Sequence, residues 1–101
     1  MIDVIAEIRT APGTRQHVLD AIHANLPAVL AEAGCLAYRP SLDLASGLDS
    51  QHQDTDSLVI LEQWQSLEHL HAHLATPHMQ AYHRQVADWV IAVRLRVLGA
   101  A

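Results

Sequence analysis

The sequence has one cysteine, no phenylalanine and only six basic residues against eleven acidic ones. A single cysteine, Cys35, excludes an internal disulfide and a cysteine-based zinc site, and it fits a reducing cytoplasm. The net charge of −5 provides no basic patch for nucleic acid. No apolar run approaches the roughly 20 residues of a membrane span, and the N-terminus lacks the basic region of a signal peptide. The absences predict a cytoplasmic protein without nucleic-acid or membrane partners.

Half of the 101 residues are hydrophobic, a high share for so small a chain. This length fits one domain, residues 1–101, with a modest core. Because large exposed apolar patches usually mark interfaces, we expect a second copy of the chain to cover part of this surface.

Hydrophobic periodicity predicts a mixed α+β domain. Period-two alternation predicts strands at 2–9, 35–42, 57–65 and 90–98. Helical spacing predicts a first helix after Thr14, which Pro27 should kink or split near Asn25, and then short helices at 67–74 and from Pro77. The polar segment 43–56 is expected to connect two strands of a hairpin.

The resulting order, β-α-β-β-α-β with the second helix broken in two, is the ferredoxin-like arrangement. It predicts a four-stranded antiparallel sheet with the helices on one face. The bare face should meet a partner sheet in a homodimer.

Five of the eight histidines lie in the stretch from Leu58 to Trp89, at positions 69, 71, 73, 78 and 83. His69 and His73 have metal-ligand spacing, but no third ligand is evident, so no metal site is predicted. Periodicity would bury His71 against Leu67, Leu70 and Leu74, and would leave His73 on the flank of the helix, where it can border a pocket. His78 starts the next helix, whose dipole favours the neutral form that a general base needs.

Three further residues are candidates for a binding site, each with a simpler alternative. Trp64 is either packing or the wall of a pocket for a flat aromatic ligand. Glu62, on the same strand face, is either a site residue or paired with Arg94, Arg96 or a histidine. Tyr38 either packs or lends its hydroxyl group to the same pocket.

The pattern E-x-W-x-S-x-x-x-L-x-x-H-L-x-T-P-H, from Glu62 to His78, resembles the antibiotic biosynthesis monooxygenase family. The P-G-T of residues 12–14 and the G-C-L-A-Y of residues 34–38 also resemble this family in the expected order. The resemblance covers nearly the whole chain and implies a dimeric α/β barrel, with a pocket between each sheet and its own helices.

Characterised members of this family include quinol and anthrone-type monooxygenases that use O₂ without a cofactor. The resemblance makes His73 and His78 the candidate catalytic bases. We expect the substrate to be bound by Trp64, Glu62, Tyr38, Tyr82 and His83.

Two departures from the family pattern narrow the expected chemistry. The third strand lacks the pocket asparagine of anthrone-type enzymes, and Glu62 or Gln63 stands near its place. Of the residues typical of haem-degrading relatives only His83 matches, so haem degradation is not expected.

The sequence therefore predicts a cofactor-independent monooxygenase that oxidises a quinol-like or polyphenolic molecule with O₂. Two alternatives stay open at this point: an isomerase or lyase acting on a small polar metabolite, and a non-enzymatic small-molecule-binding dimer module.

Overall fold

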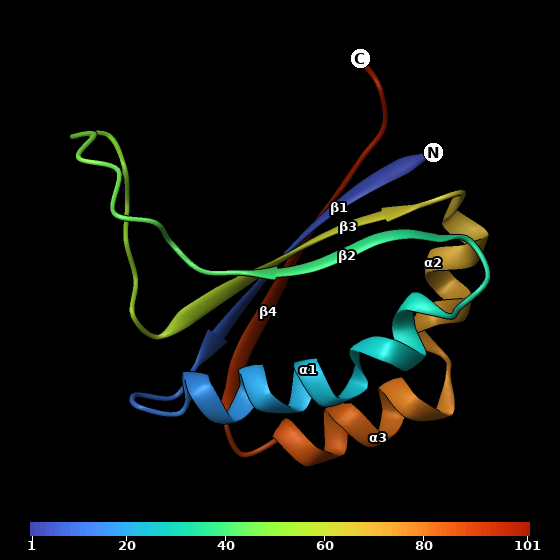
Figure 1. Ribbon diagram of the computed structural model, residues 1–101, viewed down its shortest axis with the longest axis horizontal. Coiled ribbons are helices and arrows are strands. Elements are labelled where there is room, and N and C mark those ends of the chain that lie inside the picture. The colour runs from blue at the N-terminus through green and yellow to red at the C-terminus, as the bar shows by residue number, and fades with distance from the viewer.

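The computed structural model describes all 101 residues as seven elements in the predicted order. The strands are β1 (Ile2–Thr10), β2 (Cys35–Ser41), β3 (Ser57–Trp64) and β4 (Val90–Leu98), and the helices are α1 (Arg15–Leu30), α2 (Leu67–Leu74) and α3 (Pro77–Val86). The sheet is antiparallel with strand order β2-β3-β1-β4, and all three helices lie on one side of it (Figure 1). The ferredoxin-like prediction is confirmed.

The core lies between the helices and one face of the sheet. Alternate residues of β1 and β3 point into it, from Val4, Ala6 and Ile8 on β1 and from Leu58 and Ile60 on β3. Glu62 and Trp64 continue this inward row, so the period of two places a carboxyl group and an indole inside the protein. Burial of the apolar side chains supplies most of the favourable free energy of folding.

Strand β4 has no helix packed closely over it. Its residues Val93 and Leu95 pair with Ile8 and Ala6, and therefore share the inner face of the sheet. Both remain about half exposed. The inner face is consequently open along this edge.

The break between α2 and α3 follows the capping residues predicted from the sequence. Ser66 accepts a hydrogen bond from the backbone N–H of His69, and Thr76 accepts one from that of Met79. Pro77 then occupies the first turn of α3, where no intrahelical donor is needed. None of the helices is long and apolar enough to cross a membrane.

Two local features differ from the predictions. The first helix does not split at Pro27: α1 runs without a break from Arg15 to Leu30, with Pro27 in its last turn. His71 is exposed, whereas His73 is buried. Helix α2 packs through Leu70 and His73, three residues apart, and its outer leucines, Leu67 and Leu74, stay largely in solvent.

Candidate functional site

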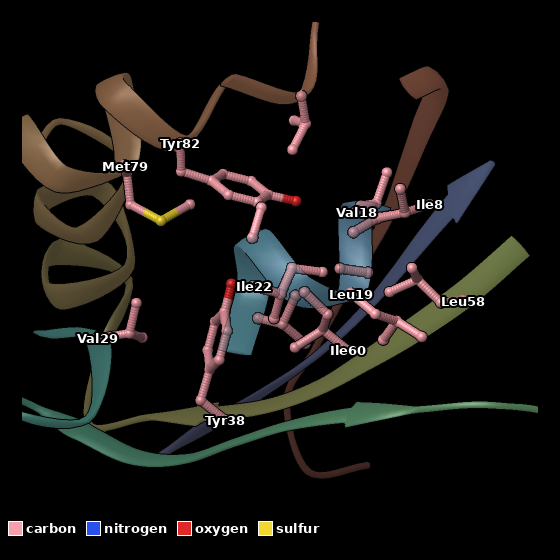
Figure 2. Close-up of a cluster of buried hydrophobic side chains, with 14 of the residues drawn as sticks. Ile8, Val18, Leu19, Ile22, Val29, Tyr38, Leu58, Ile60, Met79 and Tyr82 are labelled. Atoms are coloured by element: carbon pink, nitrogen blue, oxygen red, sulfur yellow. The ribbon is translucent and has the colours of Figure 1, made fainter. Parts of the chain in front are cut away.

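A cavity of about 270 Å³ lies between the inner face of the sheet and helices α2 and α3. Twelve of its fifteen lining residues are hydrophobic, and only Glu62, His73 and His83 are not. Figure 2 shows Tyr38 rising from β2 and Tyr82 reaching from α3 into the space beneath the helices. Small-molecule sites are typically apolar clefts of roughly 300–1,000 Å³ with a few convergent polar groups. The cavity suits a small molecule of one or two rings.

Glu62 is held on the floor of this cavity by β3. Its side chain is 6% exposed, and its Oε1 accepts a hydrogen bond of 2.9 Å from the indole Nε1 of Trp64. Arg94 and Arg96 pair with Glu7 and Ile5, which belong to the opposite face, so neither can reach Glu62. The alternative that Glu62 is paired with an arginine is therefore wrong.

Burial raises the pKa of Glu62 to about 7, against the opposing effect of the Trp64 hydrogen bond and with a smaller contribution from Glu32. Its second carboxyl oxygen has no hydrogen-bond partner, although every fully enclosed side-chain N or O atom in the protein has one. This oxygen must therefore border open space. On the helix side of the sheet, that space is the cavity.

His73 enters the cavity from α2 with 2% of its surface exposed. Its ring lies against Trp64, with centroids 4.6 Å apart, and edge-on to Tyr38 at 5.5 Å. Nδ1 lies 2.9 Å and 3.1 Å from the two carboxyl oxygens of Glu32. Because an ionised carboxylate only accepts, Nδ1 carries the proton and Nε2 is left as a free acceptor.

The environment of His73 suits a neutral imidazole. Burial lowers the pKa of His73, and its hydrogen bond to Glu32 opposes that shift. Nε2 has no protein partner and is not fully enclosed, so it opens on the cavity. This atom can accept a proton from a bound molecule.

His78, the other predicted base, does not line the cavity. Its Nε2 lies 2.8 Å from Oε2 of Glu32, the oxygen that also contacts His73. His78 thus contacts Glu32 from outside the cavity. Its role as a base stays a prediction, and the geometry favours His73.

The remaining predicted residues divide between the cavity and its surroundings. Tyr38, Tyr82 and His83 line the cavity, whereas Trp64 is fully buried behind Glu62 and His73. Burial raises the pKa of Tyr82 to about 12, and burial together with Glu62 raises that of Tyr38. Both phenol groups therefore stay protonated at neutral pH and can donate hydrogen bonds.

Glu32 is the residue of this site that the sequence did not indicate. It lies in the turn between α1 and β2, outside any periodic pattern, and 41 residues from His73. The only cue is its place in a turn, two residues before Gly34, which is no guide to a tertiary partner. No group of three or more His, Cys, Asp or Glu side chains is arranged to hold a metal ion.

Comparison with known proteins identifies relatives of this chain. Residues 1–85 match the sequence model of the family described as antibiotic biosynthesis monooxygenase. The chain is 49% identical over 100 residues to the protein named probable quinol monooxygenase YgiN of Escherichia coli K12, and the match covers 97% of this chain and 96% of that one.

Solved structures show the same fold. The structure of PA3566 from Pseudomonas aeruginosa is 26% identical with a TM-score of 0.82, and covers 99% of this chain and 93% of its own. The structure of Rv0793 from Mycobacterium tuberculosis is 27% identical with a TM-score of 0.80, covering 99% and 94%. By its sequence match over most of its length, the chain belongs to the antibiotic biosynthesis monooxygenase family.

Proposed function

We propose that the protein is a cofactor-independent monooxygenase that oxidises a quinol-like or polyphenolic molecule with O₂. The observation that carries the proposal is the apolar cavity into which the unprotonated Nε2 of His73 opens. A flat ring fits apolar walls, and a phenolic hydroxyl needs a proton acceptor beside it. The relative that is 49% identical is named probable quinol monooxygenase, which supports the same chemistry.

The proposed reaction begins with proton transfer from a ring hydroxyl to Nε2 of His73. The electron-rich anion passes an electron to O₂, and the two radicals recombine to form a carbon–oxygen bond. Breakage of the O–O bond then releases water and leaves an oxidised ring. For a hydroquinone the balance is one quinol and one O₂ giving one hydroxyquinone and one water.

The chain contributes three things to this reaction. Glu32 fixes the tautomer of His73 and stabilises the imidazolium that forms after proton transfer. The hydrophobic lining keeps water away from the reactive anion. Tyr38 and Tyr82 present protonated hydroxyl groups that can orient ring oxygens.

The test is oxygen uptake with a panel of hydroquinones in metal-free buffer. We expect uptake with quinols that persists in the presence of a chelator. His73→Gln should lower kcat by about 10²-fold or more, the usual effect of losing a general base, whereas His71→Gln, an exposed position on the same helix, should not. No uptake with any phenol, or activity abolished by the chelator, would refute the proposal.

We also propose that the working unit is a homodimer formed through the bare face of the sheet. This face carries Ile5, Val59 and Leu61, which are only partly buried in the single chain. Ile5 and Leu61 are directly paired and form the centre of an apolar strip. Apolar surface of this kind is typical of interfaces between copies.

The isomerase or lyase alternative predicts a cavity lined mainly by histidine, glutamate and arginine. The observed lining contains no arginine and is mostly aliphatic and aromatic. The monooxygenase proposal is therefore better supported.

A further inference from the structure

We propose that Glu62 is a second proton acceptor in the cavity, and that the substrate is a quinol carrying two ring hydroxyl groups, one for His73 and one for Glu62. This inference rests on the proposed function. It assigns a chemical role to a buried carboxyl group that the His73-based reaction does not use.

The carboxyl group of Glu62 has a fixed orientation. The indole of Trp64 occupies Oε1, which fixes the orientation of the group and leaves the other oxygen without a protein partner. A buried acid held for structure alone would be expected to have both oxygens satisfied. Since Glu62 lines the cavity and its side chain lies on the helix side of the sheet, we infer that the unused oxygen borders the cavity.

Two proton acceptors, Glu62 and His73, enter one cavity from different layers of the fold. Glu62 projects from β3 in the sheet, and His73 projects from α2 above it. Trp64 contacts both, by a hydrogen bond to Glu62 and by ring contact with His73, so it fixes their relative positions. A ring lying between sheet and helices presents its edge to both groups.

Burial, together with the absence of a cationic neighbour, sets the basicity of Glu62. The titratable groups that face it are Tyr38 and Cys35 on β2, Glu32 in the α1–β2 turn, His73 on α2, and Tyr82 and His83 on α3. No lysine or arginine is among them. A carboxylate without a cationic partner in an apolar site is a stronger base than one in water, which suits proton acceptance near neutral pH.

The proton balance is consistent with this role. Conversion of a hydroquinone to a hydroxyquinone breaks both phenolic O–H bonds. One proton goes to Nε2 of His73 and the other to the free oxygen of Glu62, and both are delivered to the oxygen atom that leaves as water. The ring hydrogen that is replaced ends on the new hydroxyl group, and O₂ is the oxidant.

The experiment compares two substrates and two enzymes. The wild type and Glu62→Gln are assayed with 1,4-dihydroxynaphthalene and with 4-methoxy-1-naphthol, which has only one ionisable oxygen. Glutamine keeps an acceptor for the Trp64 indole but cannot take a proton. We expect Glu62→Gln to lower kcat for the diol at least about tenfold with little change in KM, and to change turnover of the ether less than twofold.

The pH profile is a second readout. With the diol, wild-type kcat should fall as the pH drops through about 7, because Glu62 becomes protonated. In Glu62→Gln this limb should be lost, leaving only the decline at lower pH where His73 protonates. Equal effects of Glu62→Gln on both substrates, or an unchanged pH profile, would overturn the inference.

Anaerobic NMR of the Trp64 indole N–H separates this inference from the proposed function. The Trp64 signal should titrate near pH 7 in the wild type and lose that transition in Glu62→Gln; a Trp89→Phe variant distinguishes it from Trp89, which stacks on His17. A Trp64 shift on adding the diol under anaerobic conditions, combined with no O₂ uptake in the aerobic assay, would contradict the proposed function alone. Uptake of O₂ that Glu62→Gln leaves unchanged would sink the role of Glu62 alone.

Discussion

His73 and Glu32 join helix α2 to the turn between α1 and β2. Nδ1 of His73 lies 2.9 Å from Oε2 of Glu32, and the pair is nearly closed to solvent, with side chains 2% and 10% exposed. A histidine whose Nδ1 is bound by a carboxylate has one defined tautomer and one defined ring orientation. The contact therefore aims the free nitrogen of His73 at the cavity.

Glu32→Gln should lower kcat about tenfold or more while the protein remains folded. The carboxylate raises the pKa of His73 against the effect of burial, so removing its charge makes His73 a weaker base. The acid limb of the pH profile that belongs to His73 should then move to lower pH. Steady-state oxygen uptake between pH 5 and 9 measures both effects.

Glu68→Gln is the matched control for this change, because Glu68 is an exposed glutamate on the same helix as His73. It should leave kcat and the pH profile unchanged. Equal profiles for the wild type and Glu32→Gln would show that Glu32 has no effect on the basicity of His73.

The fold could be predicted from the sequence because its signals are local. Alternation along β1 and β3 and the capping residues Ser66 and Thr76 are readable without tertiary information. The same alternation placed Glu62 on the inner face. Alternation along β4 also separates Arg94 from Val93 and Leu95, but the face of the sheet on which Arg94 lies depends on the pairing of β4 with β1.

The site could be predicted only in part, because its decisive contacts are long-range. Glu32 lies in an irregular turn, and its bond to His73 depends on how α1 and α2 meet. The prediction that His71 is buried failed for a similar reason. A helix of only eight residues has too few apolar residues to define its inward face, and the contact with Trp64 places His73 there instead.

Gly34→Ala should destabilise the protein more than Gly13→Ala. Both glycines have φ near +80°, a conformation that costs an alanine about 1 kcal/mol or more. A Cβ atom at Gly34 would in addition overlap the ring of His69, whereas one at Gly13 would meet nothing within 4 Å. The His69 ring cannot move freely, because its Nδ1 is hydrogen-bonded to Ser66.

Urea unfolding of the two glycine variants separates backbone strain from steric overlap. The loss of unfolding free energy in Gly13→Ala measures the backbone strain. The additional loss in Gly34→Ala measures the steric overlap with His69. Equal losses of unfolding free energy in the two variants would mean that the His69 ring moves aside without destabilising the protein.

Leu61→Arg should convert the proposed homodimer to a monomer. Leu61 lies at the centre of the bare sheet face, beside Ile5 on β1 and Arg39 on β2. A new arginine there would remove apolar contact area and place a second charge, beside that of Arg39, in the proposed interface. Sedimentation velocity should give twice the chain mass for the wild type and the single mass for the variant.

Leu30→Arg, at an exposed leucine on α1 on the other side of the sheet, is the control and should remain dimeric. A monomeric wild type would contradict the sheet-face interface. So would a Leu61→Arg protein that sediments as a dimer.

Glu62→Gln should become progressively stabilising, relative to the wild type, as the pH rises from 5 to 8. The pKa of Glu62 is raised from an ordinary value of 4.5 to about 7, so the folded protein holds a proton that the unfolded chain has already released. Wild-type stability must therefore fall with rising pH across this window, by about 3 kcal/mol once Glu62 is ionised. Glutamine does not ionise, so the variant escapes this loss.

The measurement is the difference in unfolding free energy between wild type and variant at pH 5 and at pH 8, from urea titrations. The lowered pKa of His73 changes stability in the opposite direction, but it is present in both proteins and largely cancels in the difference. Glu68→Gln should show no such trend. A difference that stays constant between the two pH values would mean that Glu62 ionises as freely in the folded protein as in the unfolded chain, and would remove the physical basis for its action as a base near neutral pH.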